Sequence, residues 1–436
     1  MRIVALAKAP ADRVRPNEGE LLMGRAKVRQ RVAGVAAAAT LVTVLVGGSG
    51  TATAGAATGH SAKGTPIGLV EFGATTLTDS ATADGWLGVQ TEIKYINSHG
   101  GVKGRPLVAN YCYDNHDVSQ ATTCADKEIS DPSIIASVNQ WGALTPVIDP
   151  LLQNANMAQV GGTPLSSTDF TSPISFAFSS GTFGGLGGIA AIPDQLHGKK
   201  ISVLYPESLA GATLVGLVNS AVLKPRGLSL MDSVPMSTNV TDESPYVSRA
   251  DAGSPSAIFV FFGAAVANSF VTTARQLGVT APIILAGADE TSARVKQQLG
   301  GSTKNLYFWN YFHDGGSGYN ALASVMTAEG QSASKLNDNV IGGMLSVKLF
   351  AQVANKLPTV TRAGVLDALN NLSSFDTGGI TPPISFTTPG TGLGGKAPRV
   401  FNVTSTLYTY AHGKIEPYKG SPFINPFLPP KASKAG

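Results

Sequence analysis

The chain has few of the residues that mark enzymes and metalloproteins. Among its 436 residues are two cysteines and six histidines, and charged residues make up only 14%. The histidines show no metal-ligand spacing, and no second cysteine pair completes a zinc site. The Gly-x-Ser-x-Gly, phosphate-loop and His-Glu-x-x-His motifs are also missing. We therefore expect no catalytic residues, no metal and no cofactor.

A basic excess is missing from most of the chain. Of the 32 Lys/Arg and 28 Asp/Glu residues, eight and three respectively lie within 1–54. The remainder therefore has 24 bases and 25 acids, although the whole chain carries +4. Because a nucleic-acid-binding surface needs clustered positive charge, we expect no nucleic-acid partner.

The N-terminal region has the order of a secretory signal. Four basic residues within 25–31 precede an apolar run at 32–46 and small residues at 47–54. This order predicts a signal peptide with an N-terminal extension over 1–54, cleaved after Ala54 or Ala56. The apolar run is short for a spanning helix, but a retained membrane anchor is the alternative.

Two further expectations concern this region. The prefix 1–22 is unusual for a signal, and we hypothesise that Met23 rather than Met1 is the natural start. No cysteine lies near the cleavage zone, so we expect an exported protein that is not lipid-anchored through cysteine.

The two cysteines both lie in the exported part. In an oxidising compartment the natural interpretation is a disulfide between Cys112 and Cys124, with two free thiols as the alternative. Cys112 is expected at a strand end and Cys124 about two turns into the next helix. The bridge would close a short loop and stabilise the fold by roughly 3 kcal/mol.

Strand-like and helix-like segments alternate along the chain, which predicts an α/β fold with parallel sheets and helices on both faces. Two runs of this alternation predict two lobes. The expected strands are 67–72, 107–113, 134–138, 157–160, 201–205, 258–262, 283–286 and 405–410. The expected helices are 80–98, 118–130, 142–154, 211–226 and 264–277.

Two segments invite a functional interpretation that we set aside. The Gly-rich stretch 181–188 follows no clear strand, so we interpret it as a flexible crossover between the lobes and not as a dinucleotide site. The run Asp-Asn-His-Asp at 114–117 could suggest a metal, but helix capping by Asp117 or a neighbour explains it better.

Four segments, in this order, resemble the branched-chain amino acid (Leu/Ile/Val) type of periplasmic binding protein, the substrate-binding components of ATP-binding cassette importers. The first is Ile-Asn-Ser-His-Gly-Gly-Val-Lys-Gly at 96–104, and it is the most specific. The others are Tyr-Asp-Asn at 113–115 with Ser-Gln-Ala at 119–121 and Asp131, Thr-Pro-Leu-Ser-Ser at 163–167, and Phe-Asp-Thr-Gly-Gly-Ile at 375–380 with Ile-Ser-Phe at 384–386.

The resemblance implies two doubly wound parallel-sheet lobes joined by three crossovers, which close on a ligand like a hinge. The first lobe would comprise 65–183 and 313–388. The second would comprise 184–312 and 389–436.

The resemblance also implies ligand-binding residues in the first lobe. Gly142 and Ala143 would open a helix whose amides hold a carboxylate, and Ser166 and Ser167 would add hydroxyls. Ordinary turn chemistry is the alternative for the two serines. Trp141 would pack on the ligand or cap the pocket, with a core or surface role as the alternative.

In the second lobe the implied ligand-binding residues are Tyr205, Glu207 and Asp289. Asp289 would bind an α-ammonium group through a charge-assisted bond, with helix N-capping as the alternative. We therefore expect the ligand to be an amino acid or a related carboxylate or amide.

We therefore expect a monomer that captures a small-molecule ligand for a membrane permease. A ligand-sensing domain that partners a signalling receptor is the alternative, and a secreted enzyme is the third hypothesis. The latter would need a nucleophile, an acid–base pair or a metal that the sequence does not offer.

Overall fold

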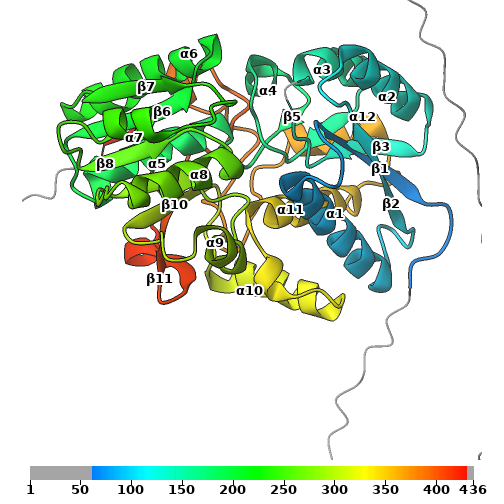
Figure 1. Ribbon diagram of the computed structural model, residues 1–436. Coiled ribbons are helices and arrows are strands. Elements are labelled where there is room, and N and C mark those ends of the chain that lie inside the picture. The colour runs from blue at the N-terminus through cyan, green and yellow to red at the C-terminus, as the bar shows by residue number, and fades with distance from the viewer. Residues whose placement is uncertain (1–60, 143, 430–436) are drawn as a thin grey trace, which may run out of the picture. The chain divides into compact units, whose positions relative to one another are not determined.

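The computed structural model describes residues 61–142 and 144–429, which belong to one compact unit, Thr58–Gly436. The expected signal segment 1–54, Ala143 and residues 430–436 lie outside the described residues. Across the described part, strands and helices alternate as expected (Figure 1). No helix within this part is both long enough and apolar enough to cross a membrane.

The first sheet has five parallel strands in the order β2-β1-β3-β4-β5. They are β1 Ile67–Gly73, β2 Leu107–Tyr113, β3 Ile134–Val138, β4 Ala158–Val160 and β5 Ser175–Phe176. Successive strands are added on one side of β1 and then on the other, so the winding reverses between β1 and β3. In open parallel sheets, ligands bind beyond the carboxyl ends of the strands at such a reversal.

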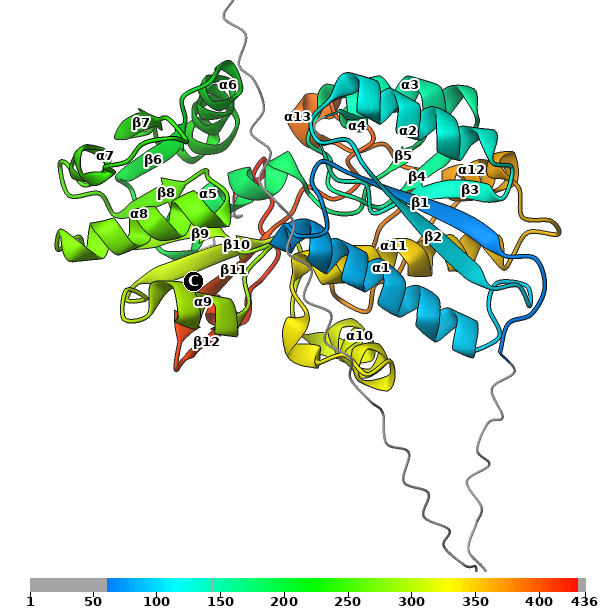
Figure 2. The ribbon, with the colours of Figure 1, turned by 45° about the vertical axis from the view of Figure 1, so that its right-hand side comes forward.

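Helices cover both faces of this sheet (Figure 2). The helices of this region are α1 Ser80–Ser98, α2 Val118–Ser130, α3 Thr145–Asn154, α4 Ser167–Thr171, α10 Gly316–Ala328, α11 Asp338–Ala354 and α12 Arg362–Asn370. Ile67 and Leu69 of β1 pack with α1 and α11, whereas Val70 and Phe72 pack with α2 and α3. Because side chains alternate along a strand, Glu71 belongs to the α1 and α11 face.

Helices α1 and α11 approach each other at glycines. A β-carbon at Gly88 of α1 would overlap the carbonyl oxygen of Val340, and one at Gly343 of α11 would overlap the carbonyl oxygen of Gly85. These positions therefore require glycine for steric reasons. The close approach brings Gly85 and the N-terminal turn of α11 to the end of β1.

The second sheet has seven strands in the order β12-β11-β10-β9-β8-β6-β7. They are β6 Ile201–Pro206, β7 Asp232–Met236, β8 Ala257–Val260, β9 Ile283–Ala286, β10 Leu306–Asn310, β11 Thr406–Ala411 and β12 Lys414–Pro417. Strands β6 to β10 are parallel, and β11 and β12 are added antiparallel at one edge. The sheet is therefore mostly but not wholly parallel.

The helices of this region are α5 Thr182–Gln195, α6 Leu209–Leu217, α7 Ser244–Ala250, α8 Ala264–Gln276, α9 Ser292–Leu299 and the short α13 Gly392–Gly395. Helix α6 continues through the π-helical turn Val218–Leu223 and the 3-10 turn Lys224–Arg226, so it covers the expected range. Short 3-10 turns also occur at Ala333–Lys335 and Tyr418–Gly420.

The stretch 181–188 lies where the chain passes from the first sheet to the second, as expected for a crossover, but its interpretation as a flexible segment is wrong. This stretch begins the buried helix α5, and β-carbons at Gly184 and Gly188 would overlap Trp309. Glycine is a poor helix former, but here its small size lets the helix pack against the second sheet. Tertiary packing therefore outweighs local propensity in this segment.

The chain passes between the two sheets three times. It leaves the first sheet after β5, returns after β10 with α10, α11 and α12, and leaves again before β11. We call the part packed on the five-stranded sheet the first lobe and the part packed on the seven-stranded sheet the second lobe. The residue boundaries given above for the lobes stay predictions.

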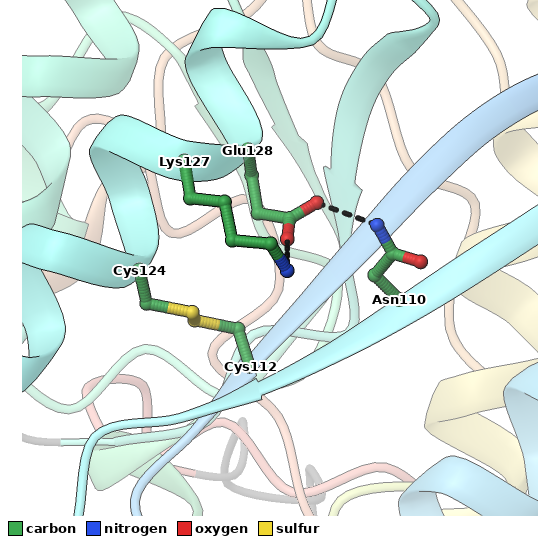
Figure 3. Close-up of a disulfide and its surroundings, with 5 residues drawn as sticks. All are labelled: Asn110, Cys112, Cys124, Lys127 and Glu128. Atoms are coloured by element: carbon green, nitrogen blue, oxygen red, sulfur yellow. Dashed lines mark hydrogen bonds and ion pairs between the residues drawn. A yellow bond between two sulfur atoms is a disulfide. The ribbon is translucent and has the colours of Figure 1, made fainter.

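Cys112 of β2 and Cys124 of α2 form a disulfide with their Cα atoms 6.2 Å apart (Figure 3). Asp117 caps α2 by accepting a hydrogen bond from the Gln120 backbone N–H at 2.8 Å, as the capping interpretation predicts. Beside the disulfide, Glu128 accepts hydrogen bonds from Asn110 and Lys127. The bridge thus ties the end of β2 to the helix that follows it.

Candidate functional site

A buried carboxyl group lies where the winding of the first sheet reverses. Glu71, near the end of β1, is only 3% exposed, and its Oε1 accepts a hydrogen bond from Asn139 Nδ2 at 2.9 Å. Its Oε2 has no hydrogen-bond partner among the described residues. Burial raises the pKa of Glu71 well above its ordinary value, and the bond from Asn139 lowers it only in part. The site therefore contains an acid that is costly to ionise without a further partner.

A small cavity of about 20 Å³ adjoins this carboxyl group. Its lining includes Glu71, Thr82, Tyr111, Trp141, Thr163 and Asn339. A second cavity, of about 10 Å³, is lined by Asn139, Thr163 and Asn339 among others. Together these cavities mark the carboxyl ends of β1, β3 and β4 and the N-terminal turn of α11.

Backbone and hydroxyl contacts hold the two aromatic residues of this lining. The Tyr111 hydroxyl donates to the carbonyl oxygen of Thr75 at 2.7 Å. The Trp141 backbone N–H donates to the carbonyl oxygen of Phe72 at 3.0 Å, and Trp141 forms a parallel bridge with Gly73, the last residue of β1. Both aromatic side chains are therefore positioned by β1 and its following loop.

Two polar contacts join the first lobe to the second beside these cavities. Asp84 of α1 accepts from both terminal nitrogens of Arg294 of α9, at 2.5 and 3.1 Å. Asn339 of α11 donates to Asp289 at 2.5 Å. The Asp289 carbonyl oxygen also accepts from Arg294. We call these two contacts the interlobe ties.

Two residues of the interlobe ties, Asp289 and Arg294, have shifted pKa values. Burial is the main cause of the raised pKa of Asp289, and the bond from Asn339 opposes it. The hydrogen bond to Asp84 raises the pKa of Arg294, so this guanidinium stays charged. Because Arg294 is charged and partly exposed, it can pair with the Asp84 carboxylate when the lobes are together and be hydrated when they part.

A larger hollow of about 320 Å³ lies between the lobes near α9, α10 and α11. Both lobes line it, with Glu290 and Asn310 from the second and Asp314 and Asp338 from the first. Burial raises the pKa of Asp338 to about 8 and that of Asp314 to about 6. This hollow adds further acidic oxygen atoms to the region where the lobes meet.

The first-lobe residues named from the sequence have different surroundings. Trp141 lines the 20 Å³ cavity, and Gly142 is buried beside it, before the start of α3 at Thr145. Ala143 lies outside the described residues. Helix α3 begins at Thr145, three residues after the expected start at Gly142.

Ser166 and Ser167 take part in the start of helix α4. The Ser166 hydroxyl accepts from the Asp169 backbone N–H at 3.3 Å and also bonds Thr145 at 2.7 Å. Ser167 is exposed as the first residue of α4. Turn and cap chemistry therefore accounts for the Ser166 contacts, and neither serine lines the two small cavities.

The second-lobe residues named from the sequence are also separated. Tyr205 lies near the end of β6, and Glu207 is exposed just after it. Neither is among the residues that line the described cavities of the interlobe region. Asp289 instead lies in an interlobe tie. Its alternative role as a helix cap is wrong, because Thr291 caps α9.

Sequence inspection missed Glu71, Asn139 and the interlobe ties. One signal was available for Glu71, because an acid inside a strand that is otherwise apolar is rare unless it is paired or functional. Asn139 has a left-handed backbone with φ of 50°, a conformation that asparagine adopts more readily than most residues. Asp84 and Arg294 are separated by 210 residues.

The family model described as "Periplasmic binding protein" matches residues 65–405. No curated protein sequence matches the chain. Solved structures of low identity share its fold of two α/β lobes with three crossovers.

Three of these structures illustrate the range. The branched-chain amino acid transporter substrate binding protein LivJ from Streptococcus pneumoniae, in complex with isoleucine, is 16% identical, with a TM-score of 0.64, and the match covers 81% of this chain and 98% of that one. A solute binding protein from R. palustris in complex with 4-hydroxybenzoate is 16% identical, with a TM-score of 0.66, and the match covers 83% of this chain and 96% of that one. A fatty acid ABC transporter substrate-binding protein from Thermomonospora curvata is 15% identical, with a TM-score of 0.67, and the match covers 85% of this chain and 95% of that one.

Proposed function

The chain belongs to the periplasmic binding protein family, and from this premise we propose that it captures a small polar solute between its two lobes for an ATP-binding cassette importer. As a member of this family it is a binding protein and not an enzyme. The solute would be held noncovalently and released unchanged.

The interlobe ties carry this proposal. They join α1 and α11 of the first lobe to the start of α9 in the second, beside the cavities at the ends of β1 and β3. These cavities are too small for a whole amino acid, since a single water needs roughly 10–15 Å³. A solute would enter when the lobes part, and the lobes would then close on it through these contacts.

The solute class we propose is an amino acid or a related carboxylate or amide. The similar structures bind isoleucine, 4-hydroxybenzoate and, by name, fatty acids, so the fold itself accepts different chemistries. In the first lobe Trp141, Gly142, Ala143, Ser166 and Ser167 are the proposed ligand-binding residues. In the second they are Tyr205, Glu207 and Asp289.

The proposed partner is the membrane permease of an importer, approached by an exported monomer. A sensor kinase would be the partner if the protein were a signalling receptor domain instead. Pull-down of membrane extracts with the liganded protein separates these two roles, because recovery of a permease supports import and recovery of a kinase contradicts it.

A ligand-library thermal shift on ligand-stripped protein tests the capture. A true solute raises the melting temperature with concentration, by RT ln(1 + [L]/Kd) in free energy. The variant Asp289→Asn should weaken this response, and Asp251→Asn, which lies away from the interlobe ties, should not. If no amino acid, amide or carboxylate shifts the melting temperature, the proposal is wrong.

A further inference from the structure

We propose that the pocket at the end of β1 receives a primary ammonium group of the solute, with the Glu71 carboxylate as its counter-ion. This inference rests on the proposed function and deepens it. The first lobe would then hold the positive end of the solute, where the sequence had suggested a grip on a carboxylate.

The first argument is the state of the Glu71 carboxyl group. Glu71 is only 3% exposed and lines the cavity, and its Oε2 is buried with no hydrogen-bond partner among the described residues. A buried acceptor of this kind costs about 1–3 kcal/mol, and more if charged, until a donor reaches it. An ammonium group supplies both the donor and the charge.

The second argument is the nature of the walls. Tyr111 and Trp141 line the same cavity, and the Tyr111 hydroxyl is already bonded to the Thr75 carbonyl oxygen. Aromatic faces attract cations, most strongly where water is excluded. Glu71 is the only charged side chain among the described lining residues, so an anion would find no counter-ion in this pocket.

The third argument is size. The cavity of about 20 Å³ has room for roughly one water-sized group, and a primary ammonium head is about that large. A quaternary ammonium or a guanidinium is too large for it. The carbon skeleton of the solute would extend from this head toward Thr163 and Asn339, whose partner Asp289 belongs to the second lobe.

Other titratable groups around Glu71 also favour a positively charged group of the solute in this pocket. Tyr111 faces it from β2, Asp114 follows that strand, and Asp79 lies at the start of α1. From the second lobe, Asp289 reaches Asn339 in the lining, while Arg294 is committed to Asp84. Burial raises the pKa of Glu71, so ammonium binding should displace a proton and should strengthen as pH rises.

The test uses methylammonium chloride on the ligand-stripped full chain at pH 8, with sodium acetate and sodium chloride at equal ionic strength. Methylammonium should raise the melting temperature, and the two sodium salts should not. The variant Glu71→Gln should need at least tenfold more methylammonium for the same shift. The matched control Glu92→Gln removes another buried acid, on α1 outside the cavity lining, and should respond like the wild type.

A second measurement does not depend on any variant. Calorimetry of methylammonium binding in two buffers of different ionisation enthalpy should reveal the release of up to one proton at pH 6, because Glu71 ionises on binding. The affinity should rise with pH, by at most tenfold per pH unit, as long as Glu71 is protonated in the free protein.

Three outcomes would overturn the inference: methylammonium acts no better than sodium chloride, it acts equally on Glu71→Gln, or acetate alone stabilises the wild type with proton uptake. These outcomes leave the proposed function standing if the library yields a solute without an amine. If the library yields no solute while methylammonium binds through Glu71, the inference stands and the proposed function fails.

Discussion

The two lobes treat their acidic residues differently. The first lobe buries Glu71, Glu92, Asp149 and Asp338, and burial raises the pKa of each of these carboxyl groups. In the second lobe, hydrogen bonds lower the pKa of Asp232 and Asp242, and its raised acids, Asp289 and Glu290, lie where it meets the first lobe. Of these acids, Glu71, Asp338 and Glu290 line the cavities described above, whereas Glu92 and Asp149 line none of them. A raised pKa therefore supports a binding site only where the acid also borders a cavity.

The lobes also differ in covalent reinforcement, and removing it is expected to give the largest effect on stability. The only disulfide, Cys112–Cys124, lies in the first lobe. Its loop of 12 residues predicts a loss of about 3 kcal/mol in the double variant to serine, by the chain-entropy model. Chemical denaturation under oxidising conditions measures this. A double variant as stable as the wild type would contradict a structural role.

A second prediction concerns the packing of α1 on α11. Gly88→Ala places a methyl group against the Val340 carbonyl oxygen and should lower the free energy of unfolding by about 2 kcal/mol. The control in the second lobe is Gly216→Ala, where a β-carbon meets nothing within 4 Å. That variant should be neutral or slightly stabilising. Equal losses in both variants would refute the special role of the first-lobe helix pair.

The interlobe ties give a third prediction. Arg294→Gln breaks the bonds to Asp84 and should shift the open-to-closed ratio of the ligand-free protein by roughly tenfold, which is about 1.4 kcal/mol. Small-angle X-ray scattering should detect this as a larger radius of gyration. Arg249→Gln is the matched control, because Arg249 pairs with Asp232 inside the second lobe. A radius that grows equally in both variants would exclude the ties as the cause.

A fourth prediction is a pH dependence that originates in the first lobe. Burial raises the pKa of Glu92 and that of Asp149 to about 7, above their unfolded values. The folded state therefore binds more protons than the unfolded state at mildly acidic pH, and stability should fall as pH rises from about 5 to 8. The loss is at most about 1.4 kcal/mol per pH unit for each group. Glu92→Gln should flatten the profile measured by urea unfolding, and an unchanged slope would contradict this assignment.

Much of the fold was predictable because its signals are local. The spans of α1 and α2 and of β2, β3 and β9 agree with their apolar patterns and turn residues to the residue. Strands such as β7 were missed, since Asp232–Met236 is short and contains a proline. Helix α5 was misinterpreted because the space beside Trp309 that requires its glycines is set by distant packing.

The candidate site was less predictable, because it depends on long-range contacts. Trp141 was identified and lines the cavity, and Ser166 takes part in the cap of α4. The bond between Glu71 and Asn139 joins residues 68 positions apart, and no periodicity reports it. Sequence patterns located the loops, and only the folded arrangement identified which side chains meet.

Hydrogen exchange on the protein with and without a bound solute from the library tests the central claim most directly. Capture between the lobes predicts slower exchange in two separate segments at once, 71–85 of the first lobe and 287–294 of the second. Protection confined to one of these segments, with the other unchanged, would contradict the account.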